Sequence, residues 1–528
     1  MDRRSLLGSG FAVGATLAAP WIAKAQAGRT LRFVPQADAA ILDPIITTGL
    51  VNRNHGFLVF DTLYGVDEQG AVQPQMVAGH TVEEGGRLVT MVLRDGLRFH
   101  DGEPVRGRDV VASLRRWASR DAFGTSLFAM LDEIAAPDDK TIRWRLKRPF
   151  PMLPEALGKV GAIVAFIMPE RLAVTDGMVA VKELVGSGPF RWKADEYVSG
   201  SRLVYARFDG YNPRPDGTPS QLAGPKRVHF DRVEWQVIPD AATASAALIR
   251  GEIDWWDQPI PDLLPQLRAN RSIKVDLLDT IGNVGVLRFN HLQPPFDNPA
   301  IRRAVLSAVN QADFMTAIAG DNRAMWRDKV GFFAPSGVMA NDEGMAALTG
   351  PRDLAAARKA IADAGYKGEK VLLMGPGDFP VISAMSEVTN DLLKKLGFNT
   401  EYAVMDWGSM LRRMGSKEPA DKGGYNLFCT YSAGVTQLNP SAHNFLRGAG
   451  EKATFGWSSS TELEALRDAW FTAPDAEAQR AIGVQAQRQA FVDVPYVPLG
   501  VFYQPTAYRA DLSGMMKGLP LFWNVRRG

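Results

Sequence analysis

The side chains best suited to catalysis are few in this chain, and they form no known motif. We find no nucleophile elbow, no Ser-x-x-Lys pair, no His-Glu-x-x-His motif, no phosphate-binding Gly-Lys-Ser/Thr loop and no paired cysteines. His100 and Asp101 are adjacent, but turn chemistry explains them better than catalysis. The sequence therefore disfavours an enzyme and predicts no cofactor. The six histidines lack ligand-like spacing, so we also predict no metal site; they are His55, His80, His100, His229, His291 and His443.

The single cysteine, Cys429, cannot form an internal disulfide. It stands in the run Asn-Leu-Phe-Cys-Thr-Tyr, which is typical of a buried strand. We therefore predict a packing role for Cys429 rather than a reactive thiol.

Tryptophans are the best candidates for binding a ligand, because a binding cleft needs aromatic surface and the chain has 12 of them. Trp255 and Trp256 are neighbours on a segment expected to be extended, so one should enter the core and the other should face a cleft. Trp407 follows a predicted strand that ends at Val404, and ligands of α/β proteins lie at such strand ends. Plain core packing is the alternative for each of them.

The elements that position these residues are clearest in residues 88–117. Alternating residues predict a strand over 88–93, and Asp95-Gly96 is a strong signal for a hairpin whose return strand carries Leu97 and Phe99. A helix should follow, with Asp109 accepting a hydrogen bond from its free amides. Its buried stripe should contain Val110, Leu114 and Trp117.

The second half of the chain reads as strand-helix-strand units. A strand over 371–374, a helical stripe over 381–392 and a strand over 398–404 predict a parallel crossover. Another helix should begin after Asn298, with Pro299 in its first turn.

Residues 93–117 also resemble the signature of the family 5 extracellular solute-binding proteins of ABC importers, the peptide, opine and nickel class. That signature runs Leu-Arg-x-Gly-x-x-Phe-x-Asp-Gly-x-Pro-x-x-Ala-x-Asp-Val-x-x-Ser, and Gly107 stands where alanine is usual. Further landmarks lie at residues 186–190, 251–254 and 289–304. The signature matches at Leu93, Arg94, Gly96, Phe99, Asp101, Gly102, Pro104, Asp109, Val110 and Ser113.

The resemblance implies an α/β, two-lobed periplasmic-binding-protein (Venus-flytrap) fold with an extra subdomain in the first lobe. The first lobe would comprise residues 28–60, 186–282 and 495–528, and the extra subdomain residues 61–185. Residues 283–494 would form the second lobe, with crossing strands near residues 275–290. The partner implied is an ABC permease in the inner membrane.

Residues 1–27 have the three regions of a cleavable export signal: Arg3 and Arg4, an apolar run over 6–19, and Ala-Gln-Ala at 25–27. The paired arginines resemble a twin-arginine leader, and an ordinary secretory leader is the alternative. Gly28, not cysteine, follows the expected cleavage site, so we predict an exported, soluble periplasmic protein without a lipid anchor.

The charge balance argues against polyanionic partners. The chain carries 60 Lys and Arg against 58 Asp and Glu, and loss of the leader, with its three basic residues and one acidic residue, makes the two counts equal. A neutral protein has no electrostatic attraction to nucleic acid, so we predict none as a partner, and we expect a monomer.

Residues 425–447 carry the information on ligand class. Peptide-binding members of the family use an aspartate here to hold the ligand's ammonium, whereas this chain has no acidic residue between Asp421 and Glu451. A buried ammonium without a counter-charge is costly, so we predict a small-molecule or peptide-like ligand that needs no free amine at this position. In the alternative, the chain is an ordinary peptide-binding protein whose counter-charge comes from elsewhere, such as Asp378 or Asp406.

We expect the ligand to bridge both lobes and to shift an open–closed equilibrium towards a closed form that the permease recognises. An exported hydrolase and a periplasmic sensor are the rival interpretations. The predicted ligand contacts include Trp255, Trp256 and Trp407. The others are Thr47 and Thr48 in the first lobe, Tyr431, Ser432 and Asn439 in the second lobe, and Asn290 at the crossing. For Asn290 the alternative role is to hold the backbone.

Overall fold

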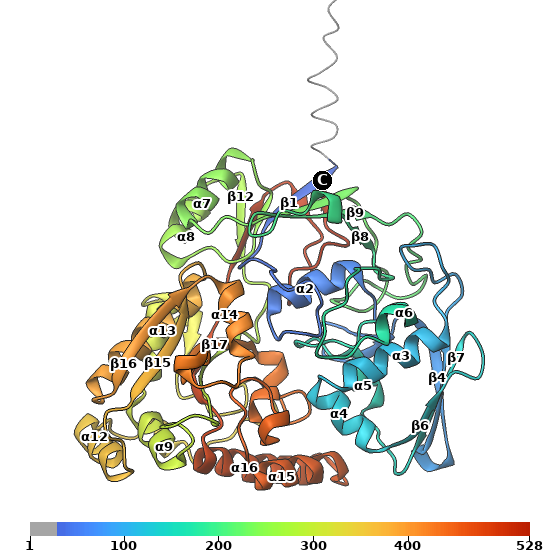
Figure 1. The fold of residues 1–528 in the computed structure, drawn as a ribbon. Helices are drawn as coiled ribbons and strands as arrows, with labels where there is room; N and C mark the ends of the chain where they lie inside the picture. Colours follow the sequence, from blue (N-terminus) through green and yellow to red (C-terminus); the bar gives the residue numbers. More distant parts are fainter. Residues whose placement is uncertain (1–28) are drawn as a thin grey trace, which may run out of the picture.

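The computed structural model describes residues 29–528, and three β-sheets with flanking helices dominate it (Figure 1). In Figure 1 a seven-stranded sheet lies at the top, a six-stranded sheet at the lower left and a four-stranded sheet at the lower right. The predicted export signal over residues 1–27 lies outside the described residues. No helix within residues 29–528 is long and apolar enough to cross a membrane.

The seven-stranded sheet is built around β1 (Thr30–Val34), which pairs in parallel with β10 and β11. Trp255 and Trp256 form β11 and point to opposite faces, as predicted for neighbours on an extended segment. Both are buried, with 1% and 5% of their surface exposed. The strand order is β12 (Ile273–Asp276), β19 (Thr506–Arg509), β11 (Trp255–Trp256), β1, β10 (Arg232–Gln236), β9 (Arg202–Arg207) and β8 (Phe190–Trp192).

The six-stranded sheet has β13 near its centre, and every residue of that strand is buried. The predicted crossover is confirmed, because β15 and β16 pair in parallel and α13 (Pro380–Lys395) connects them. The helix predicted after Asn298 is α9 (Pro299–Ala308), and the Asn298 side chain accepts the Ala300 amide at 2.9 Å. The strand order is β14 (Trp326–Arg327), β18 (Val497–Phe502), β13 (Asn283–Phe289), β17 (Leu427–Ala433), β15 (Lys370–Pro376) and β16 (Asn399–Met405).

The hairpin predicted at Asp95-Gly96 is wrong. The strand over 88–93 exists as β5 (Leu88–Leu93), but β4 and β7 already pair with its two edges, so no edge remains for a return strand. After the turn the chain instead closes a small loop in which the Phe99 amide donates to the Glu103 carbonyl at 2.8 Å. The four-stranded sheet has the order β4 (Val77–Glu83), β5, β7 (Thr141–Leu146) and β6 (Leu131–Ala135).

The helix predicted to follow is α3 (Gly107–Ala118), and its stripe of Val110, Leu114 and Trp117 is buried as expected. Asp109 lies at the third position of the helix and accepts the backbone amide of Arg106 at 2.8 Å. Its other carboxylate oxygen accepts the Glu170 amide, also at 2.8 Å. One carboxylate thus caps α3 and holds the start of α6 (Glu170–Ala173) against it.

The chain crosses between the seven-stranded and six-stranded sheets twice, over residues 277–282 and 503–505. The first crossing agrees with the expected region at 275–290. The second differs from the expected return at residue 495, because β18 still pairs with β13 and β14 in the six-stranded sheet. The chain therefore returns to the seven-stranded sheet only after Phe502, where β18 ends. β18 stays in the six-stranded sheet because the buried β13 needs a hydrogen-bonded partner on each edge.

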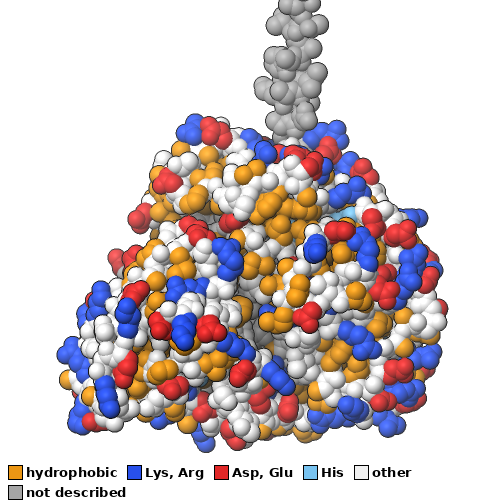
Figure 2. All heavy atoms as spheres, viewed as in Figure 1, with side chains coloured by type: hydrophobic (Ala, Val, Ile, Leu, Met, Phe, Trp, Pro, Cys, Tyr) orange, Lys and Arg blue, Asp and Glu red, His pale blue; other side chains and the backbone are white. Residues whose placement is uncertain are grey.

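The remaining elements cover the sheets or join them. The face shown in Figure 2 has basic and acidic side chains interspersed, without a large patch of one sign. The short strands are β2 (Tyr64–Val66), β3 (Val72–Pro74), β20 (Leu512–Ser513) and β21 (Arg526–Arg527). The other helices are α2 (Leu50–Val59), α4 (Ala122–Ala129), α5 (Leu153–Gly158), α7 (Ala241–Arg250), α8 (Leu264–Ala269), α10 (Gln311–Ala319), α11 (Ala346–Thr349), α12 (Leu354–Asp363), α14 (Trp407–Met414), α15 (Thr461–Thr472) and α16 (Ala476–Asp493).

Candidate functional site

Two adjoining cavities lie where the seven-stranded and six-stranded sheets face each other. The first, which we call the aromatic cavity, has a free volume of about 40 Å³ and is lined from both sides of the interface. The second, which we call the charged cavity, has a volume of about 240 Å³. Both are lined by Gln36 and Leu50, so they are neighbouring parts of one interlobe space. Other residues of the aromatic cavity are Thr48, Phe379, Ile382, Trp407, Leu411, Met414, Thr430, Tyr431, Ser432, Thr436, Asn444 and Phe445.

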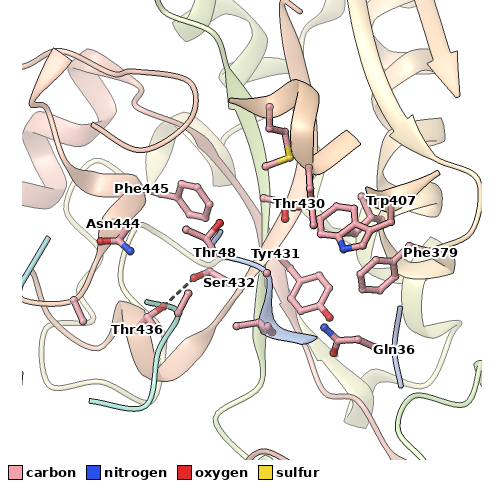
Figure 3. A pocket seen from close by; sticks show the side chains of 17 residues that line it. Gln36, Thr48, Phe379, Trp407, Thr430, Tyr431, Ser432, Thr436, Asn444 and Phe445 are labelled. Carbon is pink, nitrogen blue, oxygen red and sulfur yellow. Dashed lines mark hydrogen bonds between the residues drawn. The ribbon is translucent and has the colours of Figure 1, made fainter. Parts of the chain in front are cut away.

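Three aromatic rings form one wall of the aromatic cavity (Figure 3). Trp407 and Phe379 meet edge to face, with ring centroids 5.2 Å apart, and Phe379 meets Tyr431 in the same way at 5.9 Å. The indole nitrogen of Trp407 is buried and has no acceptor among the described residues. This wall thus offers apolar ring surface together with one buried indole N–H that has no acceptor in the described part of the chain.

The other polar groups of the aromatic cavity are hydroxyls and amides. Ser432 and Thr436 are 2.8 Å apart between their hydroxyl oxygens (Figure 3). Gln258 donates to the Gln36 side chain at 2.7 Å and to the Tyr431 hydroxyl at 3.3 Å, which joins the two lobes across the space. Burial raises the pKa of Tyr431, so its hydroxyl stays neutral. Within residues 29–528, no Asp, Glu, Lys or Arg side chain lines this cavity.

The charged cavity has a different chemistry, because Arg53 and the acidic residues Asp67, Glu68, Asp257 and Asp279 line it. Arg53 lies on α2 and is 5% exposed, while Asp257 is 8% exposed. Burial lowers the pKa of Arg53 to about 10 and raises the pKa of Asp257 to about 7. Arg53 therefore stays charged at neutral pH, and Asp257 is poised to gain or lose a proton there.

The carboxyl ends of strands supply several of these side chains. Gln36 follows β1, Asp257 follows β11, and these two strands are parallel neighbours. Trp407 follows β16 in the other sheet after a single residue, Asp406, whose side chain caps α14 through the Ser409 amide at 2.8 Å. Polar and aromatic side chains from the ends of both sheets thus meet between them, as is usual for ligand sites in α/β proteins.

The comparison with known proteins decides the family. A model of bacterial extracellular solute-binding proteins, family 5, matches residues 71–455. The chain belongs to this family. A probable peptide ABC transporter periplasmic-binding protein from Sinorhizobium fredii is 35% identical to it over 534 residues, which span 100% of this chain and 99% of the relative. A glutathione-binding protein from Salmonella typhimurium is 24% identical, over 90% of this chain and 89% of the relative.

Solved structures agree with this fold for the solute-binding protein. The periplasmic binding protein AgaA from A. tumefaciens R10, in complex with agropinic acid, has a TM-score of 0.78 at 20% identity, covering 94% of this chain and 99% of that one. DppA from Helicobacter pylori, in complex with the peptide STSA, has a TM-score of 0.76 at 21% identity, covering 96% and 99%. These structures confirm the predicted two-lobed periplasmic-binding-protein fold, and the family match with the Sinorhizobium fredii relative confirms the assignment to an ABC transporter.

The structure brings four of the predicted contact residues of this solute-binding protein together. Thr48 from the first lobe and Trp407, Tyr431 and Ser432 from the second all line the aromatic cavity. Trp255 lines the charged cavity, and its indole nitrogen donates to Thr506 at 2.6 Å.

The other predicted contacts line neither cavity. Trp256 lies on the opposite face of its sheet, among Ala244, Leu248 and other apolar side chains. The remaining three use their polar atoms locally. Thr47 accepts the Gly49 amide at 3.2 Å, Asn290 donates to the Tyr425 carbonyl at 2.9 Å, and Asn439 accepts the Ser441 amide at 2.9 Å. Asn290 thus has the backbone-holding role that was its alternative.

The residues of the interlobe space that sequence reasoning missed include Gln36, Arg53, Asp257, Asp279 and Phe379. The strand-end rule that selected Trp407 would also have found Gln36 and Asp257, since each closely follows a strand. No sequence pattern pointed to Arg53, because its helix is buried on every side and its residues show no periodic polar face.

Proposed function

We propose that this protein captures a small peptide-like or opine-like solute between its two lobes in the periplasm and delivers it to a permease of the inner membrane. The observation that carries the proposal is the interlobe space, in which an aromatic cavity adjoins a charged one. Such a space suits an amphipathic solute, because one end needs apolar surface and the other needs charged partners. The relatives named above include peptide and opine binders, which supports this class.

The part of the solute in the aromatic cavity is uncharged. No carboxylate of the described part of the chain lines that cavity, and a buried ammonium without a counter-charge would cost several kcal/mol. Asp378 and Asp406, the expected alternatives, do not line it, and each accepts a backbone amide, from Trp407 and Ser409 respectively. A free amino terminus is therefore not required at this position.

Binding is coupled to movement of the lobes. The free volume of about 40 Å³ in the aromatic cavity holds only about three water molecules. A larger solute therefore enters when the lobes separate, and the two crossing segments at 277–282 and 503–505 are the places where the backbone can bend. Closure around the solute excludes water and produces the form that the permease recognises.

The protein acts as an exported monomer without a lipid anchor, and its export signal is of the twin-arginine type. It binds without converting its solute, and it needs no metal or cofactor for this. Residues 28–60, 186–282 and 503–528 belong to the first lobe, residues 61–185 to its extra subdomain, and residues 283–502 to the second lobe.

A thermal-shift screen tests the function directly. The purified chain is heated with members of a panel of dipeptides, blocked peptides, opines, sugars and organic acids. A ligand present at 100 times its dissociation constant should stabilise the protein by about 2.7 kcal/mol. Trp407→Ala should abolish the shift and Trp407→Phe should keep part of it, while Trp192→Ala, outside both cavities, should leave it unchanged. A panel in which no compound shifts the protein contradicts the proposal.

An exported hydrolase remains the rival from another class. The same screen separates the two, because a hit is incubated with the protein and followed by mass spectrometry. Recovery of the intact compound supports binding and delivery, whereas multiple turnovers would show an enzyme.

A further inference from the structure

Arg53 is a buried cation without an anionic partner. Its guanidinium donates to the Asn54 side chain at 3.1 and 2.8 Å and to the Val160 carbonyl at 3.3 Å, all neutral acceptors. Within residues 29–528, no carboxylate lies within 4.0 Å of it, although other buried basic residues such as Arg116 and Lys226 have such partners. A buried charge without a carboxylate in direct contact is costly, so a site that keeps one is suited to bind an anion.

Four acidic residues line the same cavity: the half-buried Asp67, the exposed Glu68, and Asp257 and Asp279. Of these four, Asp257 and Asp279 act electrostatically on Arg53 without forming an ion pair with it. Asp257 follows β11, and its backbone amide donates to the Val34 carbonyl at 2.9 Å. Asp279 lies in the first crossing segment and accepts the amides of Ile281 at 2.9 Å and Gly282 at 3.2 Å. Both interact electrostatically with Arg53, so the three charges surround one space from three different segments.

A solute that carried only a carboxylate would be attracted by Arg53 but repelled by Asp257 and Asp279. A solute that carried only an ammonium would be attracted by these two acids but repelled by Arg53. The set is complementary to a group that carries both charges close together. An α-amino-acid head group does so, since its ammonium and carboxylate share one carbon. An ordinary α-peptide carries the two charges at opposite ends.

We propose that the charged cavity binds the α-amino-acid head group of the solute, with its carboxylate on Arg53 and its ammonium on Asp257 and Asp279. The rest of the solute then extends past Gln36 and Leu50 into the aromatic cavity. This proposal rests on the proposed function and names its solute class: compounds whose free amino-acid head is joined through its side chain to an apolar or aromatic group.

Two isomers test this directly by isothermal titration calorimetry with the full chain. Nε-benzoyl-lysine keeps the free head group and places an aromatic group at the far end. Nα-benzoyl-lysine has the same atoms and the same net charge, but its ammonium is remote from its carboxylate. We expect the Nε isomer to bind at least tenfold more tightly. Equal binding, tighter binding of the Nα isomer, or no binding of either overturns the proposal.

Variants assign the charges to residues. Arg53→Met should weaken binding of the Nε isomer about a hundredfold, and Arg53→Lys should recover part of the loss. Asp257→Asn is nearly isosteric and should weaken binding by a similar factor, so it keeps the test open if Arg53→Met fails to fold. Arg480→Met, on the exposed face of α16, is the matched control and should have no effect. Unchanged affinity in both site variants contradicts the assignment.

The outcomes separate this proposal from the proposed function. If neither benzoyl-lysine binds while a dipeptide or opine of the screening panel does, the function stands and the head-group assignment is wrong. If no member of the panel binds, both are wrong.

Discussion

Arg467 provides a test of how this protein holds its lobes together. It lies on α15 and is 5% exposed. Its side chain contacts α4, which packs beside the four-stranded sheet (Figure 1). Its guanidinium donates to the Ala122 carbonyl at 2.8 Å and to the Ser126 hydroxyl, both on α4. It also donates to the carbonyls of Pro440 at 3.1 Å and Ser441 at 2.9 Å on its own side.

Removal of this side chain should favour the open form. Two of its hydrogen bonds cross between the lobes, and a hydrogen bond to a charged group contributes about 1.5–3 kcal/mol. Loss of both bonds should cost the closed form about 3 kcal/mol or more relative to the open form. Since about 1.4 kcal/mol is a factor of ten, the closed-to-open ratio should fall about a hundredfold in Arg467→Met. Ser126→Ala removes one bond and should shift the ratio in the same direction by less.

Distance measurements between spin labels can read this equilibrium. Cys429 is fully buried and its burial raises the pKa of the thiol to about 12, so two introduced cysteines can be labelled selectively. Asp132 and Glu477 are exposed on opposite sides of the contact and are suitable label positions. In the unliganded protein, Arg467→Met should lengthen the distance, while the exposed Arg480→Met should leave it unchanged. An unchanged distribution in Arg467→Met would refute the idea that this arginine holds the lobes closed.

Three further predictions concern stability and reactivity. Asp43 and Arg116 form an ion pair at 2.7 Å in which both side chains are at most 1% exposed. Asp43→Asn leaves Arg116 without its counter-charge and should lower the free energy of unfolding, measured in urea, by about 3–5 kcal/mol. A loss below about 1 kcal/mol would contradict this. Burial raises the pKa of Asp257 from 3.8 in the unfolded chain to about 7 in the folded protein, so between about pH 4 and 7 the folded protein keeps a proton that the unfolded chain releases. The free energy of unfolding should therefore fall by up to about 1.4 kcal/mol for each unit by which the pH rises in this range. Asp257→Asn should flatten this dependence, and an equal slope in both proteins would contradict the reasoning. Cys429 should not react with a thiol reagent until the protein unfolds, whereas rapid reaction of the native protein would show that the strand opens.

The sequence by itself determined the local structure, because short-range patterns depend on neighbours a few residues away. The stripe of Val110, Leu114 and Trp117, the cap at Asn298 and the parallel crossover in the second half all follow from periodicity and turn chemistry. The signature over residues 93–117 also identified the family correctly. The absence of acidic residues between Asp421 and Glu451 is likewise visible in the sequence, and the ligand without a required free amine that it favours stays a prediction.

Only the tertiary structure decided which residues meet. The Asp95-Gly96 hairpin failed because strands distant in sequence occupy both edges of β5, and no local pattern shows such competition. Likewise, Arg53, Asp257 and Asp279 come from a buried helix, a strand end and a crossing segment, so their shared cavity exists only once the sheets are paired and facing. Short-range patterns predict which residues form an element, but the side chains that face a common space depend on long-range strand pairing and packing.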